Sequence, residues 1–395
     1  MIALPASRPV APLGAALLLL AACGAPAPEP RTGRAGALPV AELLSSADTE
    51  GFARAVEPRE FVFPGDHGPH PGFRTEWWYV TGNLRSPGGR RFGYQVTFFR
   101  NELTPDPPRR ASAWAAAATW MAHFAVVDGR TGRFHPFERF ARGALGLAGA
   151  AGPPREVWLE EWRLEHLPEA DAFRVTAADG EVGLDVTATP AKPPVLQGDR
   201  GLSPKGRAPG NASYYYSLTR MATRGTLRLG GRVFEVAGAS WMDREWSTSA
   251  LEEGQVGWDW FALQLADGRD LMFYRLRRAD GTTDPISAGS LVEADGSARE
   301  LTSDEVRIFA TRRWTAEDGV TYPVAWRLEV PAAGLDLAVE AIADDQEHRH
   351  TFRYWEGAVD VAGGGDEGVE GVGYVELTGY ADVDVRARAD QSPIW

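Results

Sequence analysis

The feature that most constrains the fold is a series of short strand-like runs separated by Asp-Gly pairs. These pairs begin at positions 128, 179, 267, 280, 295 and 318, and several lie within or between runs such as HFAVVDG and FALQLADGRDLMFY. Asp-Gly favours tight hairpin turns because both residues tolerate a positive φ. A helical period is suggested only at residues 41–55. The pattern predicts a mostly antiparallel, all-β chain built as barrels or sandwiches.

The length of the chain predicts two domains. At 395 residues it exceeds what a single hydrophobic core usually supports. Residues 77–100 and 258–278 both read as an aromatic strand, a turn and a second strand, which suggests two similar β-domains in tandem. The alternative is chance, because any two hairpins share this outline. We expect the N-terminal domain at residues 50–247 and the C-terminal domain at residues 248–395.

The N-terminal segment contains the only cysteine, Cys23, so an internal disulfide is excluded. The apolar stretch at residues 10–22 is too short for a stable membrane span. The letters LAAC that end at Cys23 resemble a bacterial lipobox. We therefore expect a signal peptide at residues 1–22, a lipidated Cys23, and a Pro/Ala-rich linker at residues 23–49. The protein would be a lipoprotein anchored to a membrane of the bacterial cell envelope, facing the periplasm or the exterior. The alternative is a plain secretory signal with an incidental cysteine.

The charge balance argues against a nucleic-acid partner. The formal net charge is −13, and no run of basic residues occurs. Nucleic-acid-binding proteins need clustered Lys and Arg to contact phosphates. The motifs of serine hydrolases and of nucleotide-binding loops are also absent from the sequence. These function classes are therefore disfavoured.

An aromatic run at residues 76–79 raises the question of what covers both faces of a strand. Alternation places Trp77 and Tyr79 on one face and Glu76 and Trp78 on the other. Large rings on both faces need apolar partners on both sides. We expect one face to pack the core of a barrel and the other to line a ligand pocket.

Six motifs occur in an order that resembles a known family. They are FPGDHGPHPGFRTEWWYVTGNL, YYYSLTR, GASWMDREWSTS, GWDWFALQLADGRDLMFYRLRR, YWEGAV and GVGYVELTGY. Together they make residues 50–390 similar to the secreted AttH-like proteins, which are related to bacterial carotenoid 1,2-hydratases. The resemblance implies two tandem lipocalin-like β-barrel domains. The hydratases add water to a terminal double bond of an acyclic carotenoid without a cofactor, so no cofactor is expected. Fold alone does not settle function.

The resemblance implies that Asp243, in the stretch SWMDREW, is the catalytic acid. Protonating an alkene needs a carboxylic acid whose pKa is raised by apolar surroundings, and aromatic faces can stabilise the resulting carbocation. Two departures put a copied hydratase mechanism in doubt. Trp241 stands where the hydratases have a tyrosine, and Tyr-Tyr-Tyr at residues 214–216 stands where they have a His-x-Trp pair. The alternative for Asp243 is a structural ion pair, and the candidate arginines are Arg74, Arg220, Arg244 and Arg275.

Strand parity groups the aromatic candidates around this carboxyl group. One face carries Trp241 and Asp243, a second Tyr214 and Tyr216, and a third Trp77 and Tyr79. If these faces converge, they form an apolar site with one carboxyl group, mainly within the first domain. The expected ligand-binding residues are Trp77, Tyr79, Tyr214, Tyr216, Trp241, Trp258 and Trp260. Core packing is the alternative for these rings.

The histidines follow a less specific pattern. Asp66, His67 and His70 could bind zinc, but glycine and two prolines make this segment a turn and no further His or Cys motif accompanies it. We therefore expect no metal, and we expect His67 or His70 to cap the barrel mouth or to bond the backbone. His348 and His350 are expected to face solvent.

Two function classes follow from these features. One is an enzyme, a cofactor-independent hydro-lyase or isomerase that acts on a terpenoid or other lipophilic alkene with Asp243 as acid. The other is a membrane-tethered carrier or chaperone that shields an isoprenoid or lipid-like ligand, working with a transporter. Both need an apolar pocket, and only the enzyme needs a protonatable carboxyl aimed into it. A carboxyl free of arginine favours the enzyme, and a bidentate arginine pair favours the carrier.

Overall fold

The computed structural model describes residues 38–39, 49–106, 112, 114–152, 155–248, 251–364 and 368–381. Cys23, the expected signal peptide and most of the expected linker lie outside these residues, as does most of the helix suggested at residues 41–55. Two barrel-like, almost wholly antiparallel sheets hold all the strands of the described residues, which confirms the all-β, lipocalin-like fold class. None of the helices in the described part has the length and apolar run that a membrane span requires.

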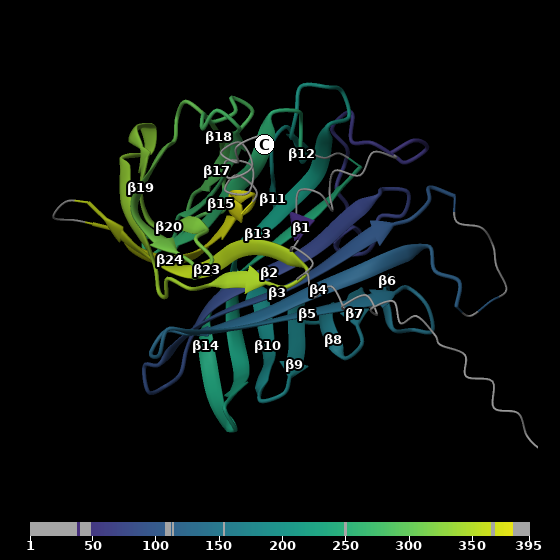
Figure 1. Cartoon of the computed structure of the whole chain (residues 1–395), viewed down its shortest axis with the longest axis horizontal. Coiled ribbons are helices and arrows are strands. Elements are labelled where there is room, and N and C mark those ends of the chain that lie inside the picture. Colours follow the sequence, from purple (N-terminus) through teal and green to yellow (C-terminus); the bar gives the residue numbers. More distant parts are fainter. Residues whose placement is uncertain are drawn as a thin grey trace, which may run out of the picture. The chain divides into compact units, whose positions relative to one another are not determined.

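The first sheet has thirteen strands in the order β5-β4-β3-β2-β14-β13-β10-β9-β8-β7-β6, with β11 and β12 paired to β13 (Figure 1). Its strands are β2 (Thr75–Arg85), β3 (Arg91–Glu102), β4 (Ala118–Asp128), β5 (Arg133–Arg142), β6 (Ala148–Ala151), β7 (Glu156–Leu159), β8 (Trp162–Leu167), β9 (Ala172–Asp179), β10 (Val182–Pro190), β11 (Val195–Leu196), β12 (Leu202–Pro204), β13 (Ala212–Leu229) and β14 (Arg232–Ser247). Of its long central strands, β13 and β14 position Asp243 and its hydrogen-bond donors, and β2 adds Trp77 and Tyr79 to the site described below.

The second sheet has eleven strands in the order β18-β17-β16-β15-β24-β23-β21-β20-β19, with β1 and β22 paired to β23. Its strands are β1 (Leu38–Pro39), β15 (Gln255–Leu265), β16 (Asp270–Arg278), β17 (Ala288–Val292), β18 (Ala298–Thr302), β19 (Arg307–Thr315), β20 (Thr321–Val330), β21 (Leu335–Ala341), β22 (Glu347–Arg349), β23 (Phe352–Gly363) and β24 (Glu370–Leu377). Two short 3-10 turns, η1 (Gly65–His67) and η2 (Pro331–Ala333), complete the described elements. The expected domain ranges 50–247 and 248–395 stay predictions.

The Asp-Gly pairs lie where the sequence predicts turns. Each one falls in the connection between two consecutive strands that pair antiparallel. The glycines with a positive φ in these turns are Gly180, Gly268, Gly281, Gly296 and Gly319. A side chain is disfavoured at such a φ, which explains why glycine occupies these turns.

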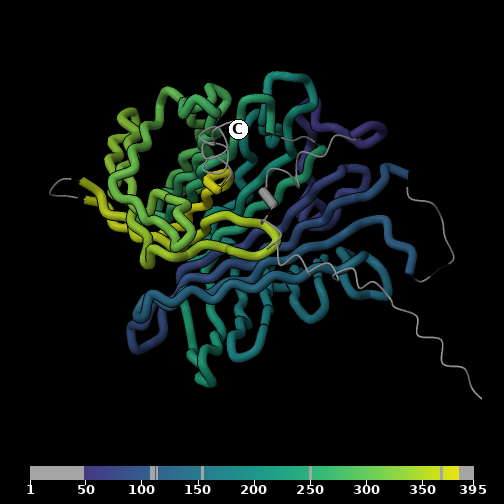
Figure 2. The backbone as a smooth tube through the Cα atoms, viewed as in Figure 1, coloured from purple at the N-terminus to yellow at the C-terminus, as the bar shows by residue number. Residues whose placement is uncertain are grey.

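The two sheets touch along β2 and β3 on one side and β23 and β24 on the other, as the tube in Figure 2 lets the reader follow. Gly93 marks a close approach of the sheets, because a Cβ atom there would lie 2.5 Å from the Cβ of Ala358 and 2.9 Å from the hydroxyl of Tyr374. Asn83 crosses the same boundary and donates from Nδ2 to the carbonyl of Gly373 at 3.0 Å. A side chain at residue 93 would therefore push the sheets apart.

Strand alternation divides the aromatic residues among separate cores. Trp78 lies in the core of the first sheet, whereas its neighbour Tyr79 belongs to a third cluster formed by residues of both sheets. The core of the second sheet contains Phe261 and Trp326. The third cluster also contains Trp260, so the aromatic run of β2 serves two different cores, as alternation requires. One of these cores surrounds the pocket.

Candidate functional site

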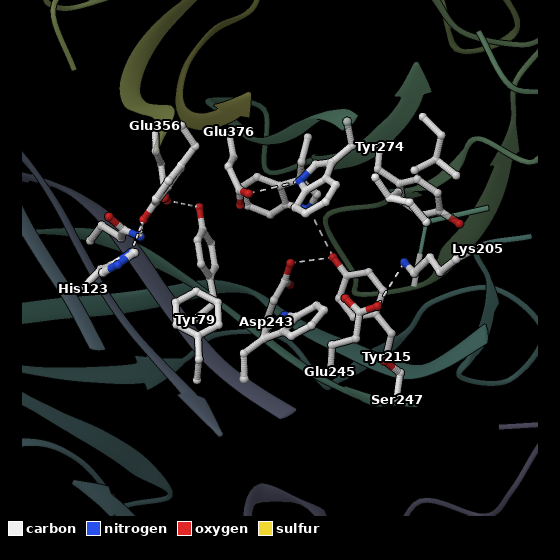
Figure 3. Close-up of a pocket in the computed structure, with 18 of the residues that line it drawn as sticks. Tyr79, His123, Lys205, Tyr215, Asp243, Glu245, Ser247, Tyr274, Glu356 and Glu376 are labelled. Carbon is white, nitrogen blue, oxygen red and sulfur yellow. Dashed lines mark hydrogen bonds and ion pairs between the residues drawn. The ribbon is translucent and has the colours of Figure 1, made fainter. Parts of the chain in front are cut away.

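A pocket of about 120 Å³ lies among residues of both sheets (Figure 3). Aromatic rings from β2, β13, β15 and β16 form much of its wall. The charged or titratable groups that also line it are His123, Lys205, Asp243, Glu245, Glu356 and Glu376. Eleven of the lining residues lie within residues 50–247 and eight lie within residues 248–395, so both sheets build the pocket. The expectation that the first domain supplies most of it stays a prediction.

Asp243 is held in the pocket wall by three neutral donors. Its Oδ1 accepts hydrogen bonds from the Ser217 hydroxyl at 2.6 Å and from the Trp241 indole N–H at 2.7 Å. Its Oδ2 accepts a hydrogen bond from the Tyr215 hydroxyl at 2.5 Å. The side chain is 4% exposed. None of the described partners of this carboxyl group carries a charge.

The two hydroxyl donors are themselves oriented by further N–H groups. Gln197 donates from Nε2 to the Ser217 oxygen at 2.9 Å, and Trp260 donates from Nε1 to the Tyr215 oxygen at 3.2 Å. Each of the two hydroxyl groups therefore accepts a hydrogen bond from an N–H group of Gln197 or Trp260 and donates its own hydrogen to the Asp243 carboxyl group. This arrangement fixes the position of the carboxyl group without adding a positive charge.

Burial raises the pKa of the Asp243 carboxyl to about 7, although the hydrogen bonds from Ser217, Tyr215 and Trp241 act to lower it. Removal from water penalises the charged form more than these neutral donors stabilise it. A carboxylic acid with a pKa near neutrality can both give and take a proton at physiological pH.

The arginine-pair alternative for Asp243 is not what the structure contains. Arg244 points to the opposite face of β14, where its guanidinium lies 3.9 Å from the ring centre of Trp78 and 2.7 Å from Glu76 Oε1. Arg220 pairs with Asp270, and Arg275 pairs with Asp259. Strand alternation explains the result for Arg244, since adjacent residues of a strand face opposite sides.

Three more carboxyl groups line the same pocket. Glu245 lies 3.1 Å from Lys205 Nζ, Glu376 accepts from the Trp258 indole at 3.1 Å, and Glu356 accepts from the Tyr79 hydroxyl. Burial raises the pKa of both Glu356 and Glu376, and repulsion from Glu376 raises that of Glu356 further.

Lys205 is the cation of this pocket. Burial acts to lower its pKa, but Glu245, Tyr274 and Asp243 outweigh burial and raise it. The ammonium group also lies 4.2 Å from the ring centre of Tyr274. Because burial favours the protonated forms of Asp243, Glu356 and Glu376, and Lys205 pairs with Glu245, the described lining is close to neutral and suits an uncharged ligand.

Five of the predicted site residues line the pocket: Trp77, Tyr79, Asp243, Trp258 and Trp260. Trp241 lies just behind the wall and donates to Asp243. The binding roles assigned to these residues stay predictions.

Tyr214 and Tyr216 do not converge with the other two faces, which corrects the parity argument. Both pack in the core of the first sheet, where each lies beside Trp246. The residue between them, Tyr215, lines the pocket instead. Their role as ligand-binding residues is therefore not supported by their position.

The register between β13 and β14 explains this correction. Ser217 lies opposite Asp243, and Tyr215 lies opposite Glu245. Directly opposite residues share a face of the sheet, so Ser213, Tyr215 and Ser217 of β13 point where Asp243 points, before the register shifts beyond Leu218. The sequence could have predicted which tyrosine faces the pocket only if the register of β13 against β14 had been known.

Several pocket residues carry no distinctive sequence signal. His123 and Lys205 lie in ordinary strand and loop segments. Glu356 and Glu376 do lie within two of the motifs shared with the resembling family, YWEGAV and GVGYVELTGY. The two motifs supported the family resemblance, but they did not predict that their carboxyl groups would line the pocket.

His67 and His70, in the segment before β2, each have side-chain hydrogen-bond partners. His67 shares a hydrogen bond of 2.6 Å with the Tyr216 hydroxyl, and His70 bridges Asp66 and Glu76 at 3.0 and 2.7 Å. Both rings thus bond side chains, whereas a bond to the backbone is one of the two expectations; the other, a cap over the barrel mouth, stays a prediction.

His348 corrects the expectation of a solvent-facing residue, because its side chain is fully buried. It stacks on Tyr354 with ring centres 4.5 Å apart and lies 5.3 Å from the ring of His123. Burial lowers its pKa well below the usual value, so the ring is neutral. His350, two residues further along, is half-buried.

The sequence profile of the AttH-like family matches residues 54–380, most of the chain. The chain belongs to the AttH-like family. The crystal structure of a protein assigned as AttH from Nitrosomonas europaea is 34% identical to it, with a TM-score of 0.74. That similarity covers 83% of this AttH-like protein and 100% of the other chain. The family resemblance seen in the sequence is therefore confirmed.

Kievitone hydratase is a more distant relative. The enzyme of Fusarium solani subsp. phaseoli is 26% identical over 180 residues, which are 44% of this chain and 49% of that protein. The match thus spans about half the length of the curated relative. The crystal structure of kievitone hydratase from Nectria haematococca is 17% identical, with a TM-score of 0.61 over 84% of this chain and 97% of that one. At that identity the structural similarity shows the fold.

Proposed function

We propose that this AttH-like protein binds a lipophilic alkene in the pocket and adds water to its C=C bond, with Asp243 as proton donor. The observation that carries the proposal is the environment of Asp243: a buried carboxyl group in an aromatic pocket, with neutral partners and a pKa of about 7. The relationship to kievitone hydratase supports a hydro-lyase class. The proposed reaction needs no cofactor.

The volume of the pocket is large enough for one end of a long lipophilic ligand, but not for the whole ligand. An apolar cavity of about 150 Å³ is known to bind one benzene ring, and the pocket here measures about 120 Å³. A branched five-carbon end of an isoprenoid fits such a space, and the rest of a longer ligand would extend beyond it. A terminal double bond is then the part of the ligand that reaches Asp243.

The first chemical step is transfer of a proton from the Asp243 carboxyl group to one alkene carbon. The O–H bond breaks, a C–H bond forms, and the other alkene carbon becomes a carbocation while Asp243 becomes a carboxylate. Tyr215 and Ser217 already point their hydroxyl hydrogens at this carboxyl group, so they stabilise the new charge without rearranging. A tertiary carbocation is favoured, which selects a branched alkene end.

The aromatic wall and the new carboxylate stabilise the carbocation. Trp260 and Tyr79 meet edge to face with ring centres 5.1 Å apart beside Asp243, and Trp241 lies 6.2 Å from Trp260. Cation–π attraction at a dry site contributes about 2 kcal/mol or more. Water then forms the C–O bond and gives its extra proton to the Asp243 carboxylate, which restores the acid. The sum is alkene plus water to alcohol.

We also propose that a lipid on Cys23 holds the protein at a membrane of the cell envelope. The proposal rests on the lipobox-like LAAC sequence and on the apolar character of the ligand class. A tether would keep the pocket near a membrane that dissolves such ligands, and a transporter is a natural partner there.

The test begins with the ligand that the protein itself selects. Lipophilic molecules extracted from purified protein are identified by mass spectrometry, and those with a branched terminal alkene, together with lycopene, are incubated with the protein in ¹⁸O-labelled water. We expect an alcohol that carries one labelled oxygen. Tight binding of such alkenes without incorporation would contradict the hydratase proposal and indicate a carrier.

A further inference from the structure

Gln95 and Glu356 each present one unpartnered polar atom in the pocket wall. Both side chains are 1% exposed, and both line the pocket. Among the described residues, Gln95 Oε1 and Glu356 Oε2 have no hydrogen-bond partner within 3.5 Å, although the Gln95 and Tyr354 side chains lie close enough to Glu356 to act on its pKa. Buried polar atoms are nearly always paired in folded proteins, and leaving one unpaired is costly. Two such atoms in one pocket therefore point to a partner that the ligand supplies.

The remaining atoms of these two groups are already in use, so neither side chain is free to turn away. Gln95 Nε2 donates to the hydroxyls of Thr97 at 3.0 Å and Tyr354 at 3.1 Å. Glu356 Oε1 accepts from the hydroxyl of Tyr79. The Tyr354 hydroxyl is in turn fixed by His123 Nδ1 at 2.5 Å. The unpartnered atoms are thus held in place by a rigid network.

The two atoms have complementary chemistry. Burial and repulsion from Glu376 favour the protonated form of Glu356, whose unpartnered oxygen is then an O–H donor. The oxygen of Gln95 is an acceptor. A group that fits both accepts one hydrogen bond and donates another, which is the property of a hydroxyl group.

We propose that Gln95 and Glu356 form a polar subsite that binds a hydroxyl group of the ligand. The ligand is then a lipophilic alcohol or phenol, in preference to a pure hydrocarbon. This inference deepens the proposed hydratase function, on which it rests for the role of the alkene. It adds a second point of attachment, so that the ligand is oriented as well as enclosed.

The arrangement of the pocket fits this orientation. Figure 3 shows Glu356 and His123 together on one side, Lys205 on the opposite side, and Asp243 between them. A ligand hydroxyl held by Glu356 would leave the adjoining carbon skeleton beside the rings of Tyr79 and Trp260. The reacting double bond would then lie near Asp243. The subsite therefore determines which carbon receives the proton.

The experiment compares two probes, phenol and toluene, which differ by a hydroxyl in place of a methyl group. Dissociation constants are measured by NMR titration for the wild type, Gln95→Leu and Glu356→Gln. Loss of one neutral hydrogen bond corresponds to roughly a threefold to tenfold change in affinity. We expect Gln95→Leu to lower the ratio of phenol to toluene affinity by this factor. Glu356→Gln keeps an N–H donor and should change the ratio by less than about twofold.

Asp243→Asn separates the two proposals. It should abolish turnover and leave the phenol-to-toluene ratio unchanged, because Gln95 and Glu356, and not Asp243, bind the phenol hydroxyl. An unchanged ratio in a folded Gln95→Leu variant, checked by circular dichroism, would overturn the subsite and leave the hydratase proposal standing. It would show that water, and not the ligand, partners the two atoms.

A second measurement covers the case in which Gln95→Leu does not fold. In the wild-type complex the hydroxyl proton of bound phenol should give a downfield resonance protected from exchange with water, because both of its hydrogen bonds are buried. Rapid exchange of that proton in the saturated complex would equally overturn the proposal.

Discussion

Ser217 and Asp243 lie directly opposite each other on β13 and β14, and the serine hydroxyl donates to Asp243 Oδ1 at 2.6 Å. Gln197 donates to the same serine oxygen, so the hydroxyl hydrogen is committed to the carboxyl group. This pairing holds Asp243 with a neutral partner. Burial is consequently the main cause of the raised pKa of this carboxyl group, and a raised pKa suits an acid catalyst.

Asp243→Asn should abolish water addition while preserving ligand binding. The amide keeps the shape of the side chain but cannot donate a proton to carbon, and loss of a general acid costs about 10²- to 10⁴-fold in rate. Turnover of lycopene and of the co-purified ligand is measured beside binding. The matched control, Asp171→Asn, alters an aspartate whose side chain is 82% exposed and should leave both unchanged. Equal turnover in wild type and Asp243→Asn would remove this residue from the mechanism.

The stability of the wild type should fall between pH 4 and pH 8 relative to Asp243→Asn. Burial raises the pKa of Asp243 from 3.8 to about 7 on folding, so the folded state binds this proton more tightly. The resulting stabilisation is complete below pH 4 and is lost as the pH rises through 7, by at most about 4 kcal/mol. Urea unfolding of both proteins across this range measures the difference. A constant difference would mean that Asp243 titrates normally.

Tyr215→Phe should move the alkaline limb of the pH–rate profile to higher pH. The tyrosine hydroxyl stabilises the ionised form of Asp243, and its removal raises the pKa of the acid further by about one unit. Tyr214→Phe is the control, since that hydroxyl donates to the carbonyl of Glu57 on the opposite face. The prediction fails if both variants keep the wild-type profile.

Arg244→Met should destabilise the fold by at least about 3 kcal/mol, because it leaves the buried carboxylate of Glu76 without its closest arginine. Arg327→Met removes a pair with Asp336 in which both side chains are about half exposed, and should change the urea midpoint far less than Arg244→Met does. Urea midpoints and m-values of the two variants are compared. Similar losses would show that burial of the Glu76 pair is not the decisive factor.

Cys23→Ser should abolish incorporation of labelled palmitate. If the lipobox-like sequence is processed as we propose, the acyl chain is attached to the cysteine thiol, and serine offers no thiol. Labelling in the native bacterial host, followed by membrane fractionation, measures the result. Equal labelling of wild type and variant would refute the lipoprotein prediction.

The sequence predicted the strand content well because hairpins are local. An Asp-Gly pair between two short runs specifies a turn within a few residues, and each predicted turn joins paired strands. The sequence also predicted that Trp77 and Trp78 face opposite sides of their strand. This prediction is local too, because side chains alternate along a strand whatever the neighbouring strands are. The family motifs then pointed to Asp243.

What the sequence by itself determined is therefore the all-β class, the faces of each strand and the candidate acid. Only the tertiary structure decided that Tyr215 and not Tyr214 shares the face of Asp243, because that depends on the register of β13 against β14. It also decided that Glu356 joins the same pocket, through packing between sheets whose residues are far apart in sequence. Register and packing between sheets are non-local, so no short stretch of this chain encodes them.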